Sequence, residues 1–493
     1  MVDRSGQGLE TEFIHRELDK NIAVLNRVLG VDASFDMICR ELEYAGRRFA
    51  LYFVDGLAKD DIMNQLMRHL SNLPEGALNT EVIAKLLRTH IGYLEVATVN
   101  RMEDVISNVL SGPLILLADG CEEGLIIDAR TYPARSPDEP DIERVVRGAR
   151  DGFTETLIFN TALTRRRLRD PSLRMEYIRV GTRSKTDICL AYLEDVADRE
   201  QVALVRDRIR RIRIDGIPMA DKTIEEFAFG NKWNPYSMVR YTERPDVAAV
   251  HLLEGHVLIY TDTSPSVMIT PTTFFHHVQH AEEYRQKPIV GAYLRWVRFF
   301  GMLASVFLLP LWYLIVQNPQ LVSGHWEILI PKDKGELPLF IQFMLAEIGI
   351  DLLRMAAIHT PSPLATALGL VAAIMMGEVA VKMGFFTEAV ILYLATAVIG
   401  TFATPSYEMG MANRLARIFL LFAVFLFQIP GFLLGVLLWF IALASTRSLN
   451  TPYLWPLVPF NGKALLDILT RPPVSDNKRR AEILSPDDPD RME

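Results

Sequence analysis

The chain has 493 residues and a net charge of −8, and half of its residues are hydrophobic, so it can hold a membrane domain beside one or two soluble domains. A pI near 5.8 excludes a globally basic surface, and we expect no nucleic-acid partner. Cys39, Cys121 and Cys189 lie far apart without C-x-x-C spacing, so the sequence predicts no zinc site and no disulfide framework.

Residues 1–34 are predicted to form a polar tail followed by one helix. Leu18, Ile22, Leu25 and Leu29 recur at helical spacing and mark one buried face. The polar start is not followed by an apolar segment, so we expect no cleavable signal peptide and a cytoplasmic amino-terminal region.

Residues 35–215 are predicted to form a soluble α/β subdomain, because short apolar runs alternate with helical patterns. The expected strands are Ala50–Val54, Pro113–Asp119, Gly124–Asp128, Met175–Val180 and Asp187–Leu193. Arg165, Arg166 and Arg167 end a predicted helix, where cations favour the negative end of the macrodipole. A phosphate or lipid head-group site is the alternative for this triplet.

Residues 216–290 are predicted to form a second soluble subdomain and a linker, with strands at Val257–Tyr260 and Val267–Thr270. His276 and His280 would share one face if this region were helical, and could then hold a metal with His277 nearby. No H-E-x-x-H motif accompanies them, so we expect a structural role and no metal.

Residues 291–460 are predicted to form an all-α, polytopic membrane domain. A helix of about 20 uncharged apolar residues crosses a bilayer, and four uncharged runs occur here: Phe299–Gln317, Met355–Gly377, Ala389–Tyr407 and Ile418–Thr446. Arg285, Lys287, Arg295 and Arg298 precede the first run, which by the positive-inside rule also favours a cytoplasmic front half. We expect four spans, or five if Leu337–His359 also crosses.

Leu337–His359 carries Glu347, Asp351 and Arg354 on one helical face. Facing lipid, this polar stripe would cost several kcal/mol, so it must face protein, water or the membrane surface. Either the helix spans and contributes ionisable groups to a water-filled path, or it lies at the interface.

Glu378 and Lys382 are four residues apart near the end of an Ala- and Gly-rich run. They are further candidates for an ion path, unless Lys382 snorkels to the interface and Glu378 only accompanies it. Gln428–Gly431 should kink the last run, whose 29 uncharged residues are long for one crossing and short for two, so a bent or re-entrant element is expected. Residues 461–493 are predicted to form a cytoplasmic tail.

No catalytic constellation stands out. The sequence has no G-x-x-x-x-G-K-[ST] phosphate loop, no G-x-G-x-x-G opening a helix and no G-x-S-x-G elbow. We therefore assign no catalytic residue and no cofactor, and expect a binding or gating function.

Several long motifs resemble the A subunit family of bacterial spore germinant receptors. They are Phe53–Leu57, Glu139–Leu168, Tyr241–Asp246, Leu252–Gly255 and Thr451–Pro456. AEIGIDLLRMAAIHTPSPLATALGL and ATPSYEMGMANR are more similar to the stage V sporulation protein AF branch. The likeness extends from about Phe35 to Pro473, although His256 and Asp262-Thr263 depart from the usual receptor pattern.

This resemblance implies a multi-pass subunit of the spore inner membrane that assembles into a ring, a pentamer, and conducts monovalent cations early in germination. It further implies another spore membrane protein as partner, with germinant receptors upstream. Two other functions stay open. The interruption near Pro430 is compatible with a secondary transporter, and the chain could be a non-conducting scaffold whose cytoplasmic domain recruits partners.

Overall fold

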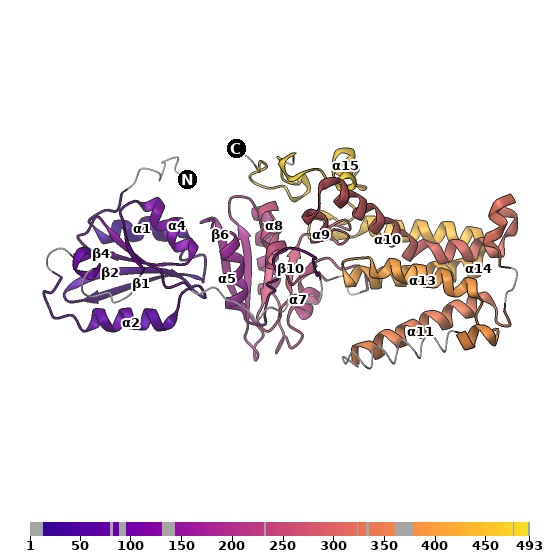
Figure 1. Cartoon of the computed structure of the whole chain (residues 1–493), viewed down its shortest axis with the longest axis horizontal. Helices are drawn as coiled ribbons and strands as arrows, with labels where there is room; N and C mark the ends of the chain where they lie inside the picture. Colours follow the sequence, from indigo (N-terminus) through magenta and orange to yellow (C-terminus); the bar gives the residue numbers. More distant parts are fainter. Residues whose placement is uncertain are drawn as a thin grey trace.

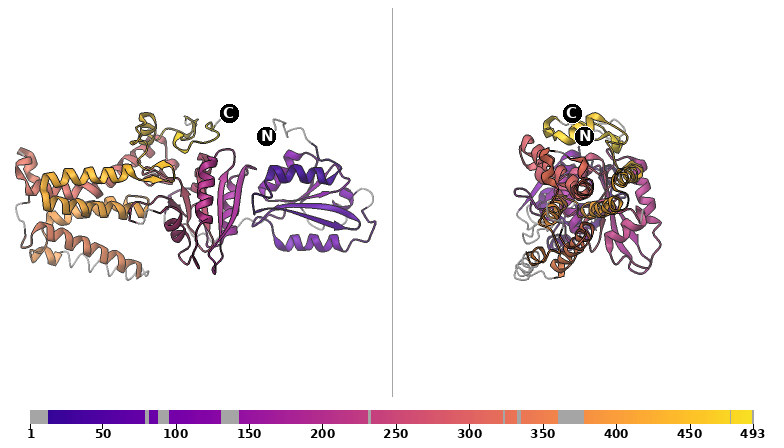
Figure 2. Two further views of the ribbon diagram at one scale, coloured as in Figure 1. Left: turned by 180° about the vertical axis from the view of Figure 1, so that it is seen from behind. Right: turned by 90° about the vertical axis from the view of Figure 1, so that its right-hand side faces the viewer.

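Three parts follow one another along the length of the molecule: a first α/β domain, a second α/β domain and a helical domain (Figures 1 and 2). The structure is a computed structural model, which describes residues 13–78, 82–87, 95–130, 143–230, 233–322, 324–331, 335–359, 378–476 and 478–491.

The first domain is an antiparallel five-stranded sheet covered by helices on both faces. Its strand order is β1-β2-β4-β5-β3. Helices α1 and α4 pack on one face, and α2 and α3 pack on the other. The elements are β1 (Met37–Tyr44), β2 (Arg47–Val54), β3 (Val96–Val99), β4 (Leu114–Ala118), β5 (Gly124–Ile127), α1 (Leu18–Leu29), α2 (Asp60–Ser71), α3 (Val82–Lys85) and α4 (Met102–Ser111). Leu18, Leu25 and Leu29 of the predicted amino-terminal helix are buried on the sheet.

The second domain has its own antiparallel sheet, in the order β6-β7-β9-β10-β8. Helices α6 and α7 cover one face, and α5 and α8 cover the other. The elements are β6 (Leu173–Val180), β7 (Thr186–Leu193), β8 (Arg240–Thr242), β9 (Val257–Thr261), β10 (Val267–Thr270), α5 (Leu157–Arg167), α6 (Arg199–Arg210), α7 (Ala220–Ala228) and α8 (Pro245–Glu254). The subdomain boundary expected at residue 215 thus falls inside this domain, because β7 pairs with β9 across it.

A buried ion pair joins the two α/β domains. Arg165 of α5 donates from Nε and Nη2 to the two carboxylate oxygens of Asp36, at 2.9 and 3.0 Å, and neither side chain is exposed to solvent. The Phe35 amide also donates to the Met175 carbonyl at the edge of the second sheet. Arg167 pairs with Asp151, so two arginines of the predicted triplet have carboxylate partners within the chain.

The helical domain is built on α10 (Pro288–Gln317), α11 (Leu339–His359), α13 (Glu388–Phe402) and α14 (Tyr407–Ser445). Among the described residues, α10 and α14 are long and apolar enough to cross a membrane, and α13 is a shorter apolar helix. The expected span from Met355 begins within α11, and its remainder from residue 360 lies outside the described residues. The other elements of the described residues are short: α9 (Ala281–Arg285), η3 (Pro319–Leu321), η4 (Gly324–Leu329), β11 (Arg447–Ser448), β12 (Thr451–Pro452), α15 (Gly462–Thr470), η5 (Val474–Asp476) and η6 (Glu482–Leu484).

Helix α14 is a hairpin with a sharp reversal at Gln428, whose φ of 50° and ψ of −125° are not helical. The second arm packs back on the first, with Gly435 against Leu420. Tyr236 lies between α7 and β8 of the second α/β domain, and its hydroxyl contacts both arms: it lies 3.1 Å from Asn413 of the first arm and 2.8 Å from Trp439 of the second. The bent element expected around Gln428 is therefore a full reversal, and both ends of α14 lie toward the second α/β domain.

The carboxyl-terminal tail returns to the second α/β domain. The Asp487 amide donates to the Val196 carbonyl at 3.0 Å, and Arg480 Nε donates to the Leu253 carbonyl at 2.8 Å. The tail and both α/β domains thus lie toward the same end of the helical domain (Figure 1).

Candidate functional site

A cluster of charged side chains lies between α11 and the first arm of α14. Glu347 of α11 accepts from Arg414 Nε at 2.9 Å, from Arg417 Nε at 2.7 Å and from Arg417 Nη2 at 3.1 Å. Only 2% of Glu347 is exposed, and both arginines are buried. Asp351 completes the cluster by pairing with Arg414, and 42% of its side chain remains exposed. Two acids and two guanidinium groups thus balance in charge.

Helical spacing produces this match. Glu347 and Asp351 are four residues apart on α11, and Arg414 and Arg417 are three apart on α14, so each pair occupies one helical face. The apolar residues Leu345, Ile348 and Leu352 lie on the exposed side of α11. The charged stripe therefore faces protein, as its cost in lipid requires.

Small residues bring α10 and α13 close enough to complete the cluster. Gly301 of α10 and Gly400 of α13 touch through their backbones, and a Cβ at position 400 would lie 2.1 Å from the Gly301 carbonyl oxygen. Beside this contact, Arg417 Nη1 donates to the Ser305 carbonyl at 2.5 Å and reaches the Thr401 hydroxyl at 3.5 Å. Arg417 thereby ties α10, α11, α13 and α14 together.

The other predicted ion-path residues, Arg354, Glu378 and Lys382, lie outside this charge cluster. Arg354 is half-buried, with its guanidinium 5.7 Å from the Phe402 ring centroid and one terminal nitrogen directed at Met411. Glu378 and Lys382 pair at 2.6 Å with side chains 62% and 71% exposed. Of the five predicted ion-path residues, Glu347 is sealed from solvent, Asp351 and Arg354 are partly exposed, and Glu378 and Lys382 form an exposed pair.

Sequence reasoning missed the two arginines that neutralise the stripe. They are Arg414 and Arg417, which directly precede the final uncharged run and are not among the predicted site residues. The available signal was their i, i+3 spacing, which matches the acid pair on α11. Glu347 accepts three charge-assisted hydrogen bonds from two permanently charged guanidinium groups and is sealed from solvent, so it is suited to fix helices and not to bind a passing ion.

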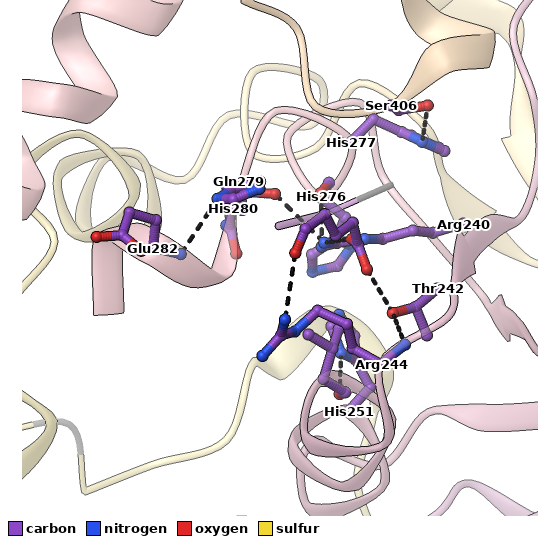
Figure 3. Close-up of polar contacts among 12 residues, drawn as sticks. Arg240, Thr242, Arg244, His251, His276, His277, Gln279, His280, Glu282 and Ser406 are labelled. Atoms are coloured by element: carbon purple, nitrogen blue, oxygen red, sulfur yellow. Dashed lines mark hydrogen bonds and ion pairs between the residues drawn. The ribbon is translucent and has the colours of Figure 1, made fainter. Parts of the chain in front are cut away.

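A second polar cluster lies where the second α/β domain meets the helices (Figure 3). The rings of His251, His256 and His276 lie with centroids 5.0 to 6.2 Å apart. His277 Nδ1 lies 3.3 Å from the hydroxyl of Ser406, which caps α14. We call these four residues and His280 the histidine cluster. It connects the sheet domain to the start of the α14 hairpin.

The histidines do not share a helical face, contrary to the geometry considered from their spacing. Residues 271–280 form turns, and α9 begins at Ala281 with His280 as its cap. Desolvation lowers the pKa of His256 to about 4 and that of His277 to about 3. Within the described ranges, no group of three or more His, Cys, Asp or Glu side chains has a geometry that could hold a metal ion.

Taken together, these features define a protein with two α/β domains joined to a helical domain that carries candidate membrane spans and an internal charge cluster. The chain belongs to the GerA family: the family described as "Bacillus/Clostridium GerA spore germination protein" matches residues 23–483.

Similarity to a Bacillus subtilis protein over nearly the whole chain supports this assignment. The chain is 47% identical to Stage V sporulation protein AF of Bacillus subtilis (strain 168) over 473 residues, which cover 96% of each chain. It is 28% identical to Spore germination protein KA of the same organism, over 97% of this chain and 88% of that protein. A solved structure, the N-terminal domain of the A subunit of the Bacillus megaterium spore germinant receptor GerK3, matches 53% of this chain and 98% of its own, with 23% identity and a TM-score of 0.41. The family match and the 47% identity make the chain a spore germination protein of the GerA family.

Proposed function

We propose that the chain is a subunit of an oligomeric channel, a pentamer, in the spore inner membrane, which releases monovalent cations and amplifies the response during germination. In this proposal the helical domain is multi-pass and both α/β domains are cytoplasmic. Another spore membrane protein and the germinant receptors are its partners, and the lipid bilayer surrounds its helices.

The observation that carries the proposal is the distribution of charge in the helical domain. The exposed surfaces of α10, α11, α13 and α14 are largely apolar, which suits lipid or neighbouring subunits. Against this surface, Asp351 remains half-exposed although its neighbour Glu347 is sealed. A partly exposed carboxylate among apolar helices is a natural place for a permeating cation, and rings of acids select cations in other channels.

Conductance measurements on the purified chain in lipid vesicles test the proposal. Asp351→Asn and Glu378→Gln each remove one exposed negative charge and are expected to reduce the preference for K⁺ over Cl⁻. The expected mass of the solubilised complex, corrected for detergent, is about 280 kDa for five copies of the 55.8 kDa chain. A folded monomer without conductance would refute the proposal.

Two alternatives retain one supporting observation each. Because Glu347 is sealed within a single chain, the cluster also suits a non-conducting scaffold that only holds its helices in place. The reversal at Gln428 resembles the interrupted helices of secondary transporters. A scaffold gives no ion flux in vesicles, whereas a transporter gives flux that saturates with substrate.

A further inference from the structure

The end of the helical domain that lies next to the second α/β domain carries a belt of exposed apolar side chains. The height of this belt along α10 can be compared with the thickness of a bilayer. Helix α10 has 30 residues and is about 45 Å long, which exceeds the roughly 30 Å hydrocarbon core. Its uncharged part, Phe299–Gln317, is about 28 Å long and fits that core. The first turns of α10 must therefore project beyond the hydrocarbon.

These first turns nevertheless expose aromatic side chains. Tyr293 is 67% exposed, Trp296 follows on the same side of the helix, and Phe300 continues this side at the start of the uncharged part. The charges of this segment point inward: Arg295 donates to the buried Glu283 carboxylate at 2.7 Å, and Arg298 pairs with the same carboxylate. The outward surface is thus aromatic where the helix leaves the hydrocarbon, as in the aromatic belts at membrane interfaces.

The segment after the α14 hairpin lies at the same level. Arg295 Nη1 donates to the Ile468 carbonyl of α15 at 2.5 Å, and the Arg471 guanidinium lies 5.2 Å from the Tyr284 ring centroid. Both figures show α15 at the side of the bundle, next to the start of α10 (Figures 1 and 2). On this segment Phe460 is 74% exposed and Leu466 is 58% exposed.

Charge accompanies the exposed apolar groups of α15. Lys463 and Asp467 are exposed on the same side of the helix as Leu466, while Leu465 and Leu469 turn inward to the core shared with Tyr453. Such a mixed outer surface fits the head-group layer, which accepts both charged and apolar groups, better than the hydrocarbon interior.

We infer that the belt formed by Tyr293, Trp296, Phe300, Phe460 and Leu466 binds the interfacial layer of the bilayer, and that α15 lies at the membrane surface as a peripheral anchor. This inference rests on the proposed membrane placement of the helical domain. It replaces the expectation that residues 461–470 belong to a tail in water. The belt is continuous with the apolar surface of α10, where Leu303 and Leu311 are also exposed, which favours lipid over a water-soluble partner.

Site-specific fluorescence in lipid nanodiscs tests the inference. The three native cysteines are replaced by alanine in the full-length chain, and retention of fold is checked by circular dichroism and size-exclusion chromatography. An environment-sensitive dye is then attached at Phe460→Cys or Leu466→Cys. Arg183→Cys in the second α/β domain is the aqueous control, and Leu433→Cys on the exposed side of α14 is the bilayer control.

We expect dyes at positions 460 and 466 to emit at shorter wavelength than the dye at 183 and to lose at least half of their intensity to lipids that carry a spin label near the head group. If only position 433 is quenched, the inference is wrong and the membrane placement stands. If position 433 is not quenched either, the membrane placement itself fails. Blue-shifted emission at 460 and 466 without lipid quenching would assign the belt to contact with a second copy and overturn the inference.

Discussion

Replacement of Glu347 by glutamine should destabilise the helical domain. The substitution keeps the size of the side chain but removes the negative charge that neutralises Arg414 and Arg417. Asp351 can still balance Arg414, whereas Arg417 loses its carboxylate and keeps only uncharged acceptors: the glutamine amide oxygen, the Ser305 carbonyl and the Thr401 hydroxyl. Breaking a buried ion pair from one side costs about 3–5 kcal/mol.

Thermal unfolding of the full-length protein in detergent, followed by circular dichroism, measures this cost. A loss of this size lowers the midpoint by on the order of 10 °C in a domain of 150–250 residues. The matched control is Glu378→Gln, which removes the same charge from an exposed pair and should change stability by less than about 1 kcal/mol.

Two results would contradict the role assigned to Glu347. An unchanged midpoint for Glu347→Gln, equal to that of the Glu378→Gln control, would show that the buried pair contributes little to stability. A stable Glu347→Gln protein with an altered ion preference would show instead that Glu347 meets water in the assembled protein and that the cluster opens there.

Three further predictions concern packing, domain coupling and pH. Gly400→Ala should cost about 1–3 kcal/mol because its Cβ would overlap the Gly301 carbonyl, whereas Gly349→Ala on α11, with open space around it, should be neutral or slightly stabilising in the same unfolding assay. Asp36→Asn should leave Arg165 buried without its counter-ion and make the link between the α/β domains sensitive to limited proteolysis, while Glu122→Gln, from an exposed pair, should leave the cleavage pattern unchanged. Acid should destabilise the second α/β domain, because burial lowers the pKa values of the histidine cluster and the unfolded chain therefore binds protons at higher pH than the folded chain. The free energy of unfolding should fall as the pH drops from about 6.5 toward 4, by up to about 1.4 kcal/mol per pH unit for each histidine. Replacing His256 with glutamine should reduce this slope in urea unfolding titrations, and an unchanged slope would contradict the assignment.

Local pattern alone was enough to predict many of the elements. The amphipathic spacing from Leu18 to Leu29 gave α1, and the apolar run Ala50–Val54 lies within β2. The uncharged run Phe299–Gln317 lies within α10. In each case the signal comes from residues next to one another or one helical turn apart, since side-chain periodicity follows from backbone geometry.

The sequence by itself also determined that the stripe of Glu347, Asp351 and Arg354 could not face lipid, because transfer of charge into hydrocarbon is too costly. It could not decide what neutralises the stripe. That depended on tertiary packing, which places the first arm of α14 beside α11 so that Arg414 and Arg417 reach Glu347. Arg414 and Arg417, about 65 residues further along the chain, could with the same spacing flank the final apolar run at the membrane surface or act as buried counter-ions. Only tertiary packing, which brings distant segments together, distinguishes the two roles.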